Sequence, residues 1–335
     1  MVTEPHPVSR MKVLVTGGSS LLARRTAEAL LARGDEVVLL QRGASTLDTT
    51  QVHGDVRDAD LVRSAVEGCD AVIHAAAKVG VIGSWEDYRS INVDGTGNVI
   101  AAAREFGVSR VVYVSTPSVS HTGHSLVGAP ADPPVTGRTD AHYAESKAMA
   151  ERLALGASSN ALPVVAIRPH LVWGPGDTQL VGRIVERAKA GRLALVGGGA
   201  ALIDTTYIDN AASALVAALD ATVPGAACVG KAYVIANGEP RPIRELIEGI
   251  LHAAGVEATP RVVPLRVALG IGSIVEKVWG RARPDEEPPL TRFLAEQLGT
   301  AHWFDPRPAR TDLRWHPTVT IDEGLAALAA WFTTH

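Results

Sequence analysis

A tyrosine and a lysine four residues apart are the pair in this chain best able to do chemistry. Tyr143 and Lys147 lie in "HYAESKAMAE", where apolar residues recur at helical spacing, so both side chains share one face of a helix. An ammonium group beside a phenol lowers a phenol pKa that starts at about 10. We therefore predict that Tyr143 donates a proton to a substrate oxygen near neutral pH.

The strand predicted just before this helix adds hydroxyl groups to the same site. The run "RVVYVS" ends at Ser115, and Thr116 follows it. In parallel sheets, ligands bind outside the carboxyl ends of the strands. These two hydroxyls and the tyrosine and lysine pair are therefore expected to meet at one edge of a sheet.

The rest of the pattern predicts the sheet that positions these residues. Short β-branched runs alternate with helical patterns, which indicates a parallel sheet with helices on both faces, a doubly wound α/β fold. We expect this domain over residues 11–168, and a smaller substrate-binding region over 169–335 that returns a late strand to the core. The strands are predicted at 12–16, 36–40, 71–74, 110–115, 164–168 and 232–235, and the helices at 21–33, 58–67, 84–106 and 143–155.

The turn after the first predicted strand is similar to a dinucleotide-binding turn but lacks two glycines. In "MKVLVTGGSSLLARR", Gly17 supplies the tight turn, whereas Ser20 and Ala23 stand where the second and third glycines are usual. Serine is a good N-cap, and its hydroxyl can donate to an anion. Arg24 and Arg25 put positive charge in the first turns of the helix, which favours a bound phosphate; two solvated surface arginines are the alternative.

The end of the second predicted strand favours one nicotinamide cofactor. An acid there would bond the ribose 2′-hydroxyl, whereas an arginine accommodates a 2′-phosphate. This chain has "LLQRG", with Gln41 and Arg42 and no acid. We therefore predict NADP(H) in preference to NAD(H).

Composition argues against several other classes of protein. The 335 residues carry a net charge of −4 and no run of Lys or Arg, so we expect no nucleic-acid partner. Two isolated cysteines, Cys69 and Cys228, fit a reducing compartment, and the polar N-terminus has no apolar signal region. We predict a cytoplasmic protein and no metal site, because no cluster has metal-ligand spacing.

One apolar segment in the C-terminal half, "LRVALGIGSIVEKVW", begins at Leu265 and ends at Trp279. It is too short and too charged to predict a membrane span. We interpret it first as a lid, because little else in this half could line an apolar substrate pocket. A helix that docks on a partner, and one that makes the protein peripheral to a membrane, remain open.

These motifs resemble the extended short-chain dehydrogenase/reductase family, and within it the 3β-hydroxysteroid dehydrogenase-like branch. The resemblance runs from Val13 to Trp331. Its motifs are "VLVTGGSSLLA", "GDVRD", "VIHAAA", "INVDGTGNV", "YVSTPSV", "YAESK", "IRPHLVWGPGD" and "DTTYIDNAA". A finer similarity, to the 2-alkyl-3-oxoalkanoate reductases of bacterial long-chain olefin biosynthesis, rests on "AAKVGVIGSW", "STPSV", "RPHLVWGPGD", "DTTYIDNA" and "PPLTRFLAEQLGTAHWFD".

The resemblance implies a Rossmann fold and a role at each matching position. Tyr143 would protonate the carbonyl oxygen, and Lys147 would lower its pKa and hold the nicotinamide ribose. Thr116 would be the catalytic hydroxyl, or Ser115 if the register slips by one. Asp55 would meet the adenine, and the segment at Pro169 would touch the nicotinamide. The implied cofactor contacts are Gly17, Ser20, Leu21, Leu22, Arg42, Asp55, Val56, Ala75, Ala76, Ala77, Lys147, Pro169 and His170.

The function that the resemblance implies is NADPH-dependent reduction of the ketone of a lipophilic 3-oxo acid, which gives a 3-hydroxy acid, in a homodimer. A 3β-hydroxysteroid or sterol-4-carboxylate 3-dehydrogenase is the alternative within the family. A sensor or scaffold that binds a dinucleotide without turnover is the alternative from another class. Only the missing glycines support it, and the set of Thr116, Tyr143 and Lys147 argues against it.

Several other polar residues have a structural as well as a functional interpretation. Asn92 could relay a proton through water or bond backbone groups at a helix bend. His170 could contact substrate or make a structural hydrogen bond. A solvated loop is expected at His121 and His124, and packing or helix-start roles at Asp204, Tyr207 and Asp209, with Asp209 as a helix cap.

Overall fold

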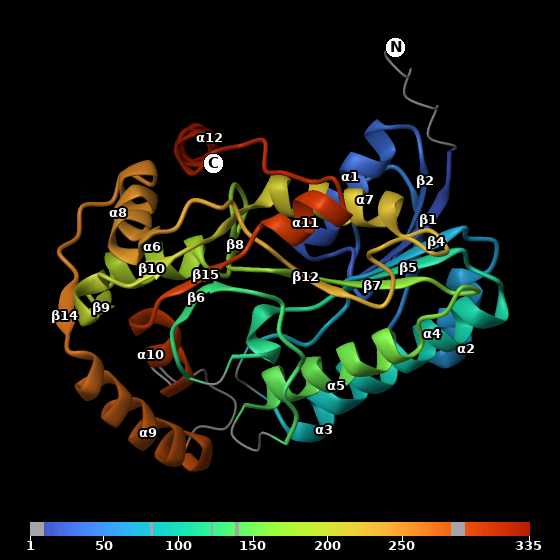
Figure 1. The fold of residues 1–335 in the computed structure, drawn as a ribbon. Coiled ribbons are helices and arrows are strands. Elements are labelled where there is room, and N and C mark those ends of the chain that lie inside the picture. Colours follow the sequence, from blue (N-terminus) through green and yellow to red (C-terminus); the bar gives the residue numbers. More distant parts are fainter. Residues whose placement is uncertain (1–9, 81–82, 122, 138–140, 283–291) are drawn as a thin grey trace.

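A parallel sheet forms the centre of the protein in the computed structural model, which describes residues 10–80, 83–121, 123–137, 141–282 and 292–335 (Figure 1). The strands lie in the order β3-β2-β1-β4-β5-β7-β12, and each neighbouring pair is parallel. Their bounds are β1 Lys12–Thr16, β2 Glu36–Gln41, β3 Thr50–His53, β4 Ala71–His74, β5 Arg110–Val114, β7 Val164–Pro169 and β12 Ala232–Ile235.

The strands at the centre of the sheet are mostly apolar because helices cover both faces. The "AVIH" of β4 is buried at every residue, and β1 is buried at all but its first. The six predicted strands are all present. The sequence pattern missed β3, an edge strand whose "TQVH" is exposed or half-buried throughout and so lacks an apolar run.

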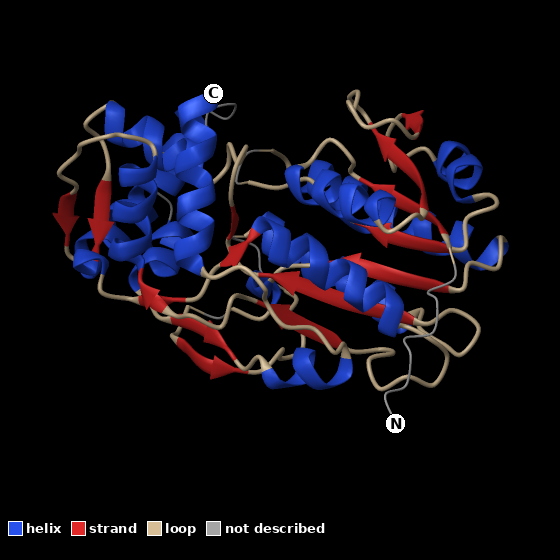
Figure 2. Cartoon of the chain, turned by 90° about the horizontal axis from the view of Figure 1, so that it is seen from above, coloured by secondary structure: helices blue, strands red, loops and turns tan. Residues whose placement is uncertain are grey.

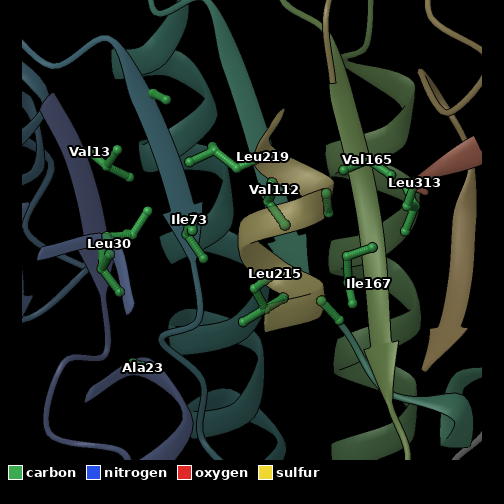
Figure 3. Close-up of a cluster of buried hydrophobic side chains, with 14 of the residues drawn as sticks. Val13, Ala23, Leu30, Ile73, Val112, Val165, Ile167, Leu215, Leu219 and Leu313 are labelled. Carbon is green, nitrogen blue, oxygen red and sulfur yellow. The ribbon is translucent and has the colours of Figure 1, made fainter. Parts of the chain in front are cut away.

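The helices form two layers, which confirms the predicted doubly wound α/β fold (Figures 1 and 2). One face carries α1 (Leu21–Ala32), α7 (Ile208–Ala221) and α11 (Arg307–Asp312), and the other carries α2 (Ala59–Val66), α4 (Gly95–Glu105) and α5 (His142–Gly156). Between the first layer and the sheet, side chains such as Val13, Ile73 and Leu215 are fully buried in one cluster (Figure 3). This burial of apolar surface is the main source of stability for the sheet.

The single helix predicted at 84–106 is divided into three. A short α3 (Trp85–Tyr88) leads into a π-helical turn, η1 (Arg89–Asp94), before α4 begins. Wider π turns insert a residue into the helical ladder and often occur near functional sites. The apolar period of the sequence does not reveal such an insertion, because it shifts the period by only one residue.

The C-terminal half builds a second, smaller core beside the sheet (Figure 2). Trp173 and Ile208 are fully buried there. The remaining strands are β6 Leu126–Ala129, β8 Val172–Trp173, β9 Ala194–Val196, β10 Leu202–Ile203, β11 Thr206–Tyr207, β13 Arg241–Pro242, β14 Arg261–Val263 and β15 His302–Phe304. The remaining helices are η2 Pro117–Val119, α6 Val181–Lys189, η3 Gly197–Gly199, α8 Ile243–Ala253, α9 Leu265–Ala282, α10 Arg292–Gly299 and α12 Ile321–Thr334.

Candidate active site

The turn after β1 approaches the neighbouring β4 loop so closely that it needs a glycine. Gly17 has a φ of +76°, and a Cβ there would lie 2.8 Å from the Cα and the N of Ala76. Its own N–H donates to the Leu40 carbonyl of β2 at 2.8 Å. The turn is therefore fixed between β2 and β4, at the carboxyl ends of the strands.

A cavity of about 330 Å³ opens above this turn. The predicted cofactor residues that line it are Gly17, Ser20, Arg42, Asp55, Val56, Ala75, Ala76 and Ala77. Lys78 and Gly54 also line the cavity, although no motif in the sequence indicated them as contacts, and Gln41 lines it as well. Leu21, Leu22, Lys147, Pro169 and His170 are not among the lining residues.

Ser20 caps the helix that follows the turn. Its Oγ accepts a hydrogen bond from the N–H of Ala23 at 3.3 Å, and α1 begins at the next residue. The side chain is exposed and lines the cavity. The hydroxyl proton is not used by the cap, so Ser20 can still donate to an anion.

The two arginines of α1 lie beside protein carboxylates. Their positive charge therefore does not indicate the bound phosphate that the sequence pattern predicted. Arg24 and Arg25 both lie near Glu28, at 3.9 Å and 3.2 Å between the charged atoms. Arg25 also lies 3.8 Å from Asp209 on α7. These carboxylates balance the positive charge at the start of the helix, so the two arginines need no bound phosphate.

At the end of β2, a buried amide presents an acceptor that has no partner. The Nε2 of Gln41 donates to Gln51 at 2.9 Å, and Gln51 is itself held by the backbone of Ser45 and Leu47. The Gln41 Oε1 is buried and has no hydrogen-bond partner within the described residues. A buried unpaired acceptor is costly, and Gln41 is among the residues that line the cavity.

A cluster of charges stands beside this amide. Arg57 binds Asp55 at 2.9 Å, and its hydrogen bond, aided by the charge of Arg42, holds the pKa of Asp55 below the usual range. Asp55 is therefore ionised at neutral pH. Arg42 is exposed at the rim of the cavity, where its guanidinium can meet an anion.

Tyr143 and Thr116 meet at the carboxyl end of β5. Burial raises the pKa of Tyr143 to about 12, and the side-chain hydrogen bond with Thr116 opposes that shift. Thr116 is also the N-cap of η2, because its Oγ1 accepts from the N–H of Ser118 at 3.3 Å. Ser115 is buried, and its Oγ has no partner within the described residues.

The Lys147 side chain is directed to the sheet. The sequence predicted instead that its ammonium group lies beside the Tyr143 phenol. Its Nζ donates to the carbonyl of Val114 at 2.7 Å and lies 4.3 Å from the centre of the Tyr113 ring. Burial lowers the pKa of Lys147 to about 7, although Glu151 opposes the change. The lysine shares a helix face with Tyr143, but its ammonium group contacts a carbonyl and an aromatic ring of β5.

Asn92 bonds backbone groups at the helix bend, as the second interpretation of this residue expects. Its Oδ1 accepts from the N–H of Lys78 at 2.7 Å, and its Nδ2 donates to the Lys78 carbonyl at 3.1 Å. Nδ2 also donates to the Ser146 hydroxyl of α5 at 2.9 Å. The π turn that carries Asn92 thereby joins the β4 loop to the helix of Tyr143.

The buried histidines near the site contact other protein groups. His170 bonds the Asp204 carbonyl through Nδ1 at 2.5 Å, and its ring packs on Phe304. His121 is buried with its Nε2 3.2 Å from that of His302, so the predicted solvated loop is wrong for His121, whereas His124 is exposed. His302 is distant in sequence, and no local pattern could indicate it.

The predicted helix-start residues behave differently from one another. Asp204 is buried and accepts from the N–H of Gly238 at 2.9 Å, and Tyr207 packs against Trp173. Asp209 is not the cap, because α7 begins after Tyr207 and no side chain caps it. Instead Asp209 lies in the first turn, where a negative charge suits the helix dipole.

The apolar segment predicted as a lid is helix α9, at one end of the molecule (Figure 1). Ala268 is buried against Val196 and Ala295, whereas Val267, Ile271 and Ile274 are exposed. No helix within the described residues is both long and apolar enough to cross a membrane. The lid, the partner contact and the membrane-surface contact stay predictions.

Comparison with known proteins places the chain in one family. Residues 14–266 match the model of the 3-beta hydroxysteroid dehydrogenase/isomerase family. A 2-alkyl-3-oxoalkanoate reductase of Stenotrophomonas maltophilia is 48% identical over 96% of this chain and 99% of its own. One from Shewanella oneidensis is 39% identical over 94% and 85%, and a 3-beta-hydroxysteroid dehydrogenase of Mycolicibacterium neoaurum is 32% identical over 96% and 90%.

Solved structures share the fold at lower identity. A UDP-glucuronic acid 4-epimerase of Bacillus cereus, solved with NAD, has a TM-score of 0.73 and 21% identity, with 97% of this chain and 99% of that chain covered. The Bordetella bronchiseptica enzyme WbmH, solved with NAD+, has a TM-score of 0.71 and 23% identity over 97% and 99%. The chain thus belongs to the 3-beta hydroxysteroid dehydrogenase/isomerase family, and it is a dinucleotide-dependent oxidoreductase of the extended short-chain dehydrogenase/reductase type.

Proposed function

We propose that this protein is an NADPH-dependent reductase of a lipophilic 3-oxo acid, a 2-alkyl-3-oxoalkanoate, which it converts to the 3-hydroxy acid. The substrate follows from the 48% identity to a 2-alkyl-3-oxoalkanoate reductase over nearly the whole of both chains. The chemistry follows from one observation of the structure, the Tyr143 phenol beside the Thr116 hydroxyl at the carboxyl end of β5. That arrangement can protonate a ketone oxygen as it becomes an alkoxide.

The residues around the cavity fit a dinucleotide. Gly17 closes the tight turn against the β4 loop, Ser20 offers a hydroxyl at a helix start, and Gln41 and Arg42 line the cavity at the end of β2. A nicotinamide cofactor, when bound, supplies the hydride. Lys147, which lies a helical turn beyond Tyr143, would hold the nicotinamide ribose.

Preference for the phosphorylated cofactor rests on Arg42. It is exposed at the rim next to Gln41, where an acid would otherwise accept from the ribose 2′-hydroxyl. A 2′-phosphate would bring negative charge to this guanidinium, whereas the neutral Gln41 amide would not repel it. Asp55 is engaged by Arg57 and is the carboxylate that would meet the adenine.

Proton donation is the role that we assign to Tyr143. Because burial raises the pKa of Tyr143 to about 12, the phenol is protonated at neutral pH and is ready to act in the direction of ketone reduction. The Thr116 hydroxyl would hold the substrate oxygen beside the phenol. In the reverse direction, a positive charge near the phenol is needed to favour the phenolate, and Lys147 is the nearest candidate.

The experiment is a comparison of substrates with the purified protein. The stable 2-alkyl-3-hydroxy acid with NADP+ and the corresponding 3-oxo acid with NADPH test both directions, and a 3β-hydroxysteroid with either cofactor tests the alternative. We expect turnover of the acids at least tenfold more efficient than that of the steroid. Faster turnover of the steroid would refute the substrate, and NADPH binding with no turnover of either would favour a sensor.

A further inference from the structure

An ion pair that is closed off from solvent involves the helix that carries Tyr143 and Lys147. Glu151 and Arg168 are both 0% exposed, and their charged groups meet at two points, with Nε to Oε2 at 2.8 Å and Nη2 to Oε1 at 2.5 Å. Glu151 lies on α5, on the same helix face as Lys147 and Tyr143, and Arg168 lies on β7. The pair therefore joins the helix of the proposed proton donor to the sheet.

The same guanidinium also holds the loop that carries Thr116. Arg168 Nη1 donates to the carbonyl of Asp132 at 2.8 Å and lies 3.5 Å from the Ser120 hydroxyl. Ser120 ends η2, the short helix that Thr116 caps. Val135 donates to the carbonyl of Val119 at 2.8 Å, which links the Asp132 segment to η2. One buried side chain thus connects α5, η2 and the segment between them.

Stability alone does not explain this pair. Taking two charges out of water costs nearly as much as their attraction returns, so apolar side chains of similar volume would often do as well. Breaking such a pair is costly, however, because it leaves one charge buried without a partner, so the pair holds its elements in one arrangement. Its geometric effect is to fix Tyr143 and Thr116, which come from different elements, relative to each other.

Glu151 also determines the charge around Lys147. The described groups that face this lysine are the Val114 carbonyl and the Tyr113 ring of β5, His74 of β4, and Glu151 of its own helix. Burial lowers the pKa of Lys147, and Glu151 is the charge that opposes this. His74 is neutral at pH 7 because burial lowers its pKa to about 3.

We infer that Glu151 and Arg168 are positioning residues for the reaction: the pair fixes α5 against the loop of Thr116, and Glu151 places a carboxylate on the α5 face that carries Lys147. The inference uses the proposed role of Lys147 in holding the cofactor. It goes beyond the proposed function because it assigns a catalytic purpose to two residues that touch neither cofactor nor substrate.

The test compares Glu151→Gln, which removes the charge, with Glu151→Asp, which keeps it. The measurements are the NADPH dissociation constant against pH, from nucleotide fluorescence, and the pH profile of kcat/KM. Loss of Glu151 leaves Arg168 uncompensated, and both changes disfavour the ammonium form of Lys147. We expect the alkaline limb of both profiles to move to lower pH by about one unit in Glu151→Gln and to stay in place in Glu151→Asp.

A double variant and a control keep the test decisive. If Glu151→Gln does not fold, Glu151→Leu with Arg168→Leu removes both charges and should show a smaller shift in the same direction, because no uncompensated Arg168 remains. Asp35→Asn is the matched control, because Asp35 is 4% exposed and paired with Arg33 at the far, amino end of β2. It should lower the unfolding temperature and leave the profiles unchanged.

The outcomes separate this inference from the proposed function. Unmoved profiles in Glu151→Gln, or in the double variant if the single one does not fold, would mean that the pair is only structural. An equal shift in Glu151→Asp would mean that its charge does not matter. Absence of turnover in the wild type would refute the proposed function, yet the NADPH profile would still test the inference.

Discussion

Replacement of Arg42 by alanine should separate the two nicotinamide cofactors. The guanidinium is exposed at the rim of the cavity, next to the buried Gln41 amide. A hydrogen bond to a charged group is worth about 1.5 to 3 kcal/mol, and exposure to solvent and salt puts Arg42 near the lower end. Because about 1.4 kcal/mol is tenfold in affinity, we expect NADPH to bind roughly tenfold more weakly to Arg42→Ala.

The affinity for NADH should change less than twofold, because NADH has a neutral 2′-hydroxyl in place of the phosphate. Titration of nucleotide fluorescence at low salt and at high salt measures both effects, and the NADPH advantage of the wild type should shrink as salt screens the charge. Arg24→Ala is the control, since Arg24 is an arginine near the same turn that lies beside Glu28. Equal weakening of NADPH and NADH by Arg42→Ala, or tighter binding of NADH than NADPH to the wild type, would refute the reasoning.

Three further predictions concern the proton donor, the turn and acid stability. Tyr143→Phe keeps the ring and removes the proton, so turnover should fall at least roughly hundredfold while the NADPH dissociation constant stays the same; near-normal turnover would refute the mechanism. Ser20→Ala and Ser20→Gly should both weaken NADPH binding, by about fivefold for one lost hydrogen bond, whereas tighter binding to Ser20→Gly would show that the side chain obstructs the phosphate. Burial lowers the pKa of His170 to about 4 and those of His74 and His302 to about 3, so these three histidines take up protons on unfolding below about pH 6.5 and stability should fall as the pH drops. Asp204 has the opposite effect, because its pKa is raised to about 6 in the folded protein. Asp204→Asn should therefore steepen the loss of stability between pH 6 and pH 4, measured by chemical denaturation. A wild type equally stable at pH 7 and pH 4.5 would contradict this.

The sheet was predictable because each central strand is indicated by a run of apolar residues in its own local sequence. The runs at β1 and β4 are short and consist mainly of β-branched and other apolar residues, and burial on both faces is what such runs indicate. The edge strand β3 gives no such signal, since its Thr50 and His53 face solvent. The π turn at Asn92 was also hidden, because it is specified by bonds to the distant Lys78 and Ser146.

The site was predictable in its members and less so in its electrostatics. Spacing puts Tyr143 and Lys147 on one helix face, but the direction of the lysine depends on the Val114 carbonyl of another element. Likewise, the charge of Arg25 was read from its place on a helix, whereas its partner Asp209 comes from α7. A local sequence pattern cannot show which charged or polar group of another element lies beside a given charge.

Strand order explains why one ligand can join two groups of residues that do not touch. Arg42 follows β2 and Thr116 follows β5, and β1 and β4 lie between them. Three spacings of about 4.8 Å place these strand ends roughly 14 Å apart, so only an extended ligand that crosses the turn at Gly17 could engage both. The Arg42 end can fix which dinucleotide binds, while the Tyr143 end can act on the ketone. Substitutions at the first end should therefore change cofactor affinity with little effect on kcat at saturation, and substitutions of Tyr143 or Thr116 at the second should change kcat with little effect on cofactor affinity.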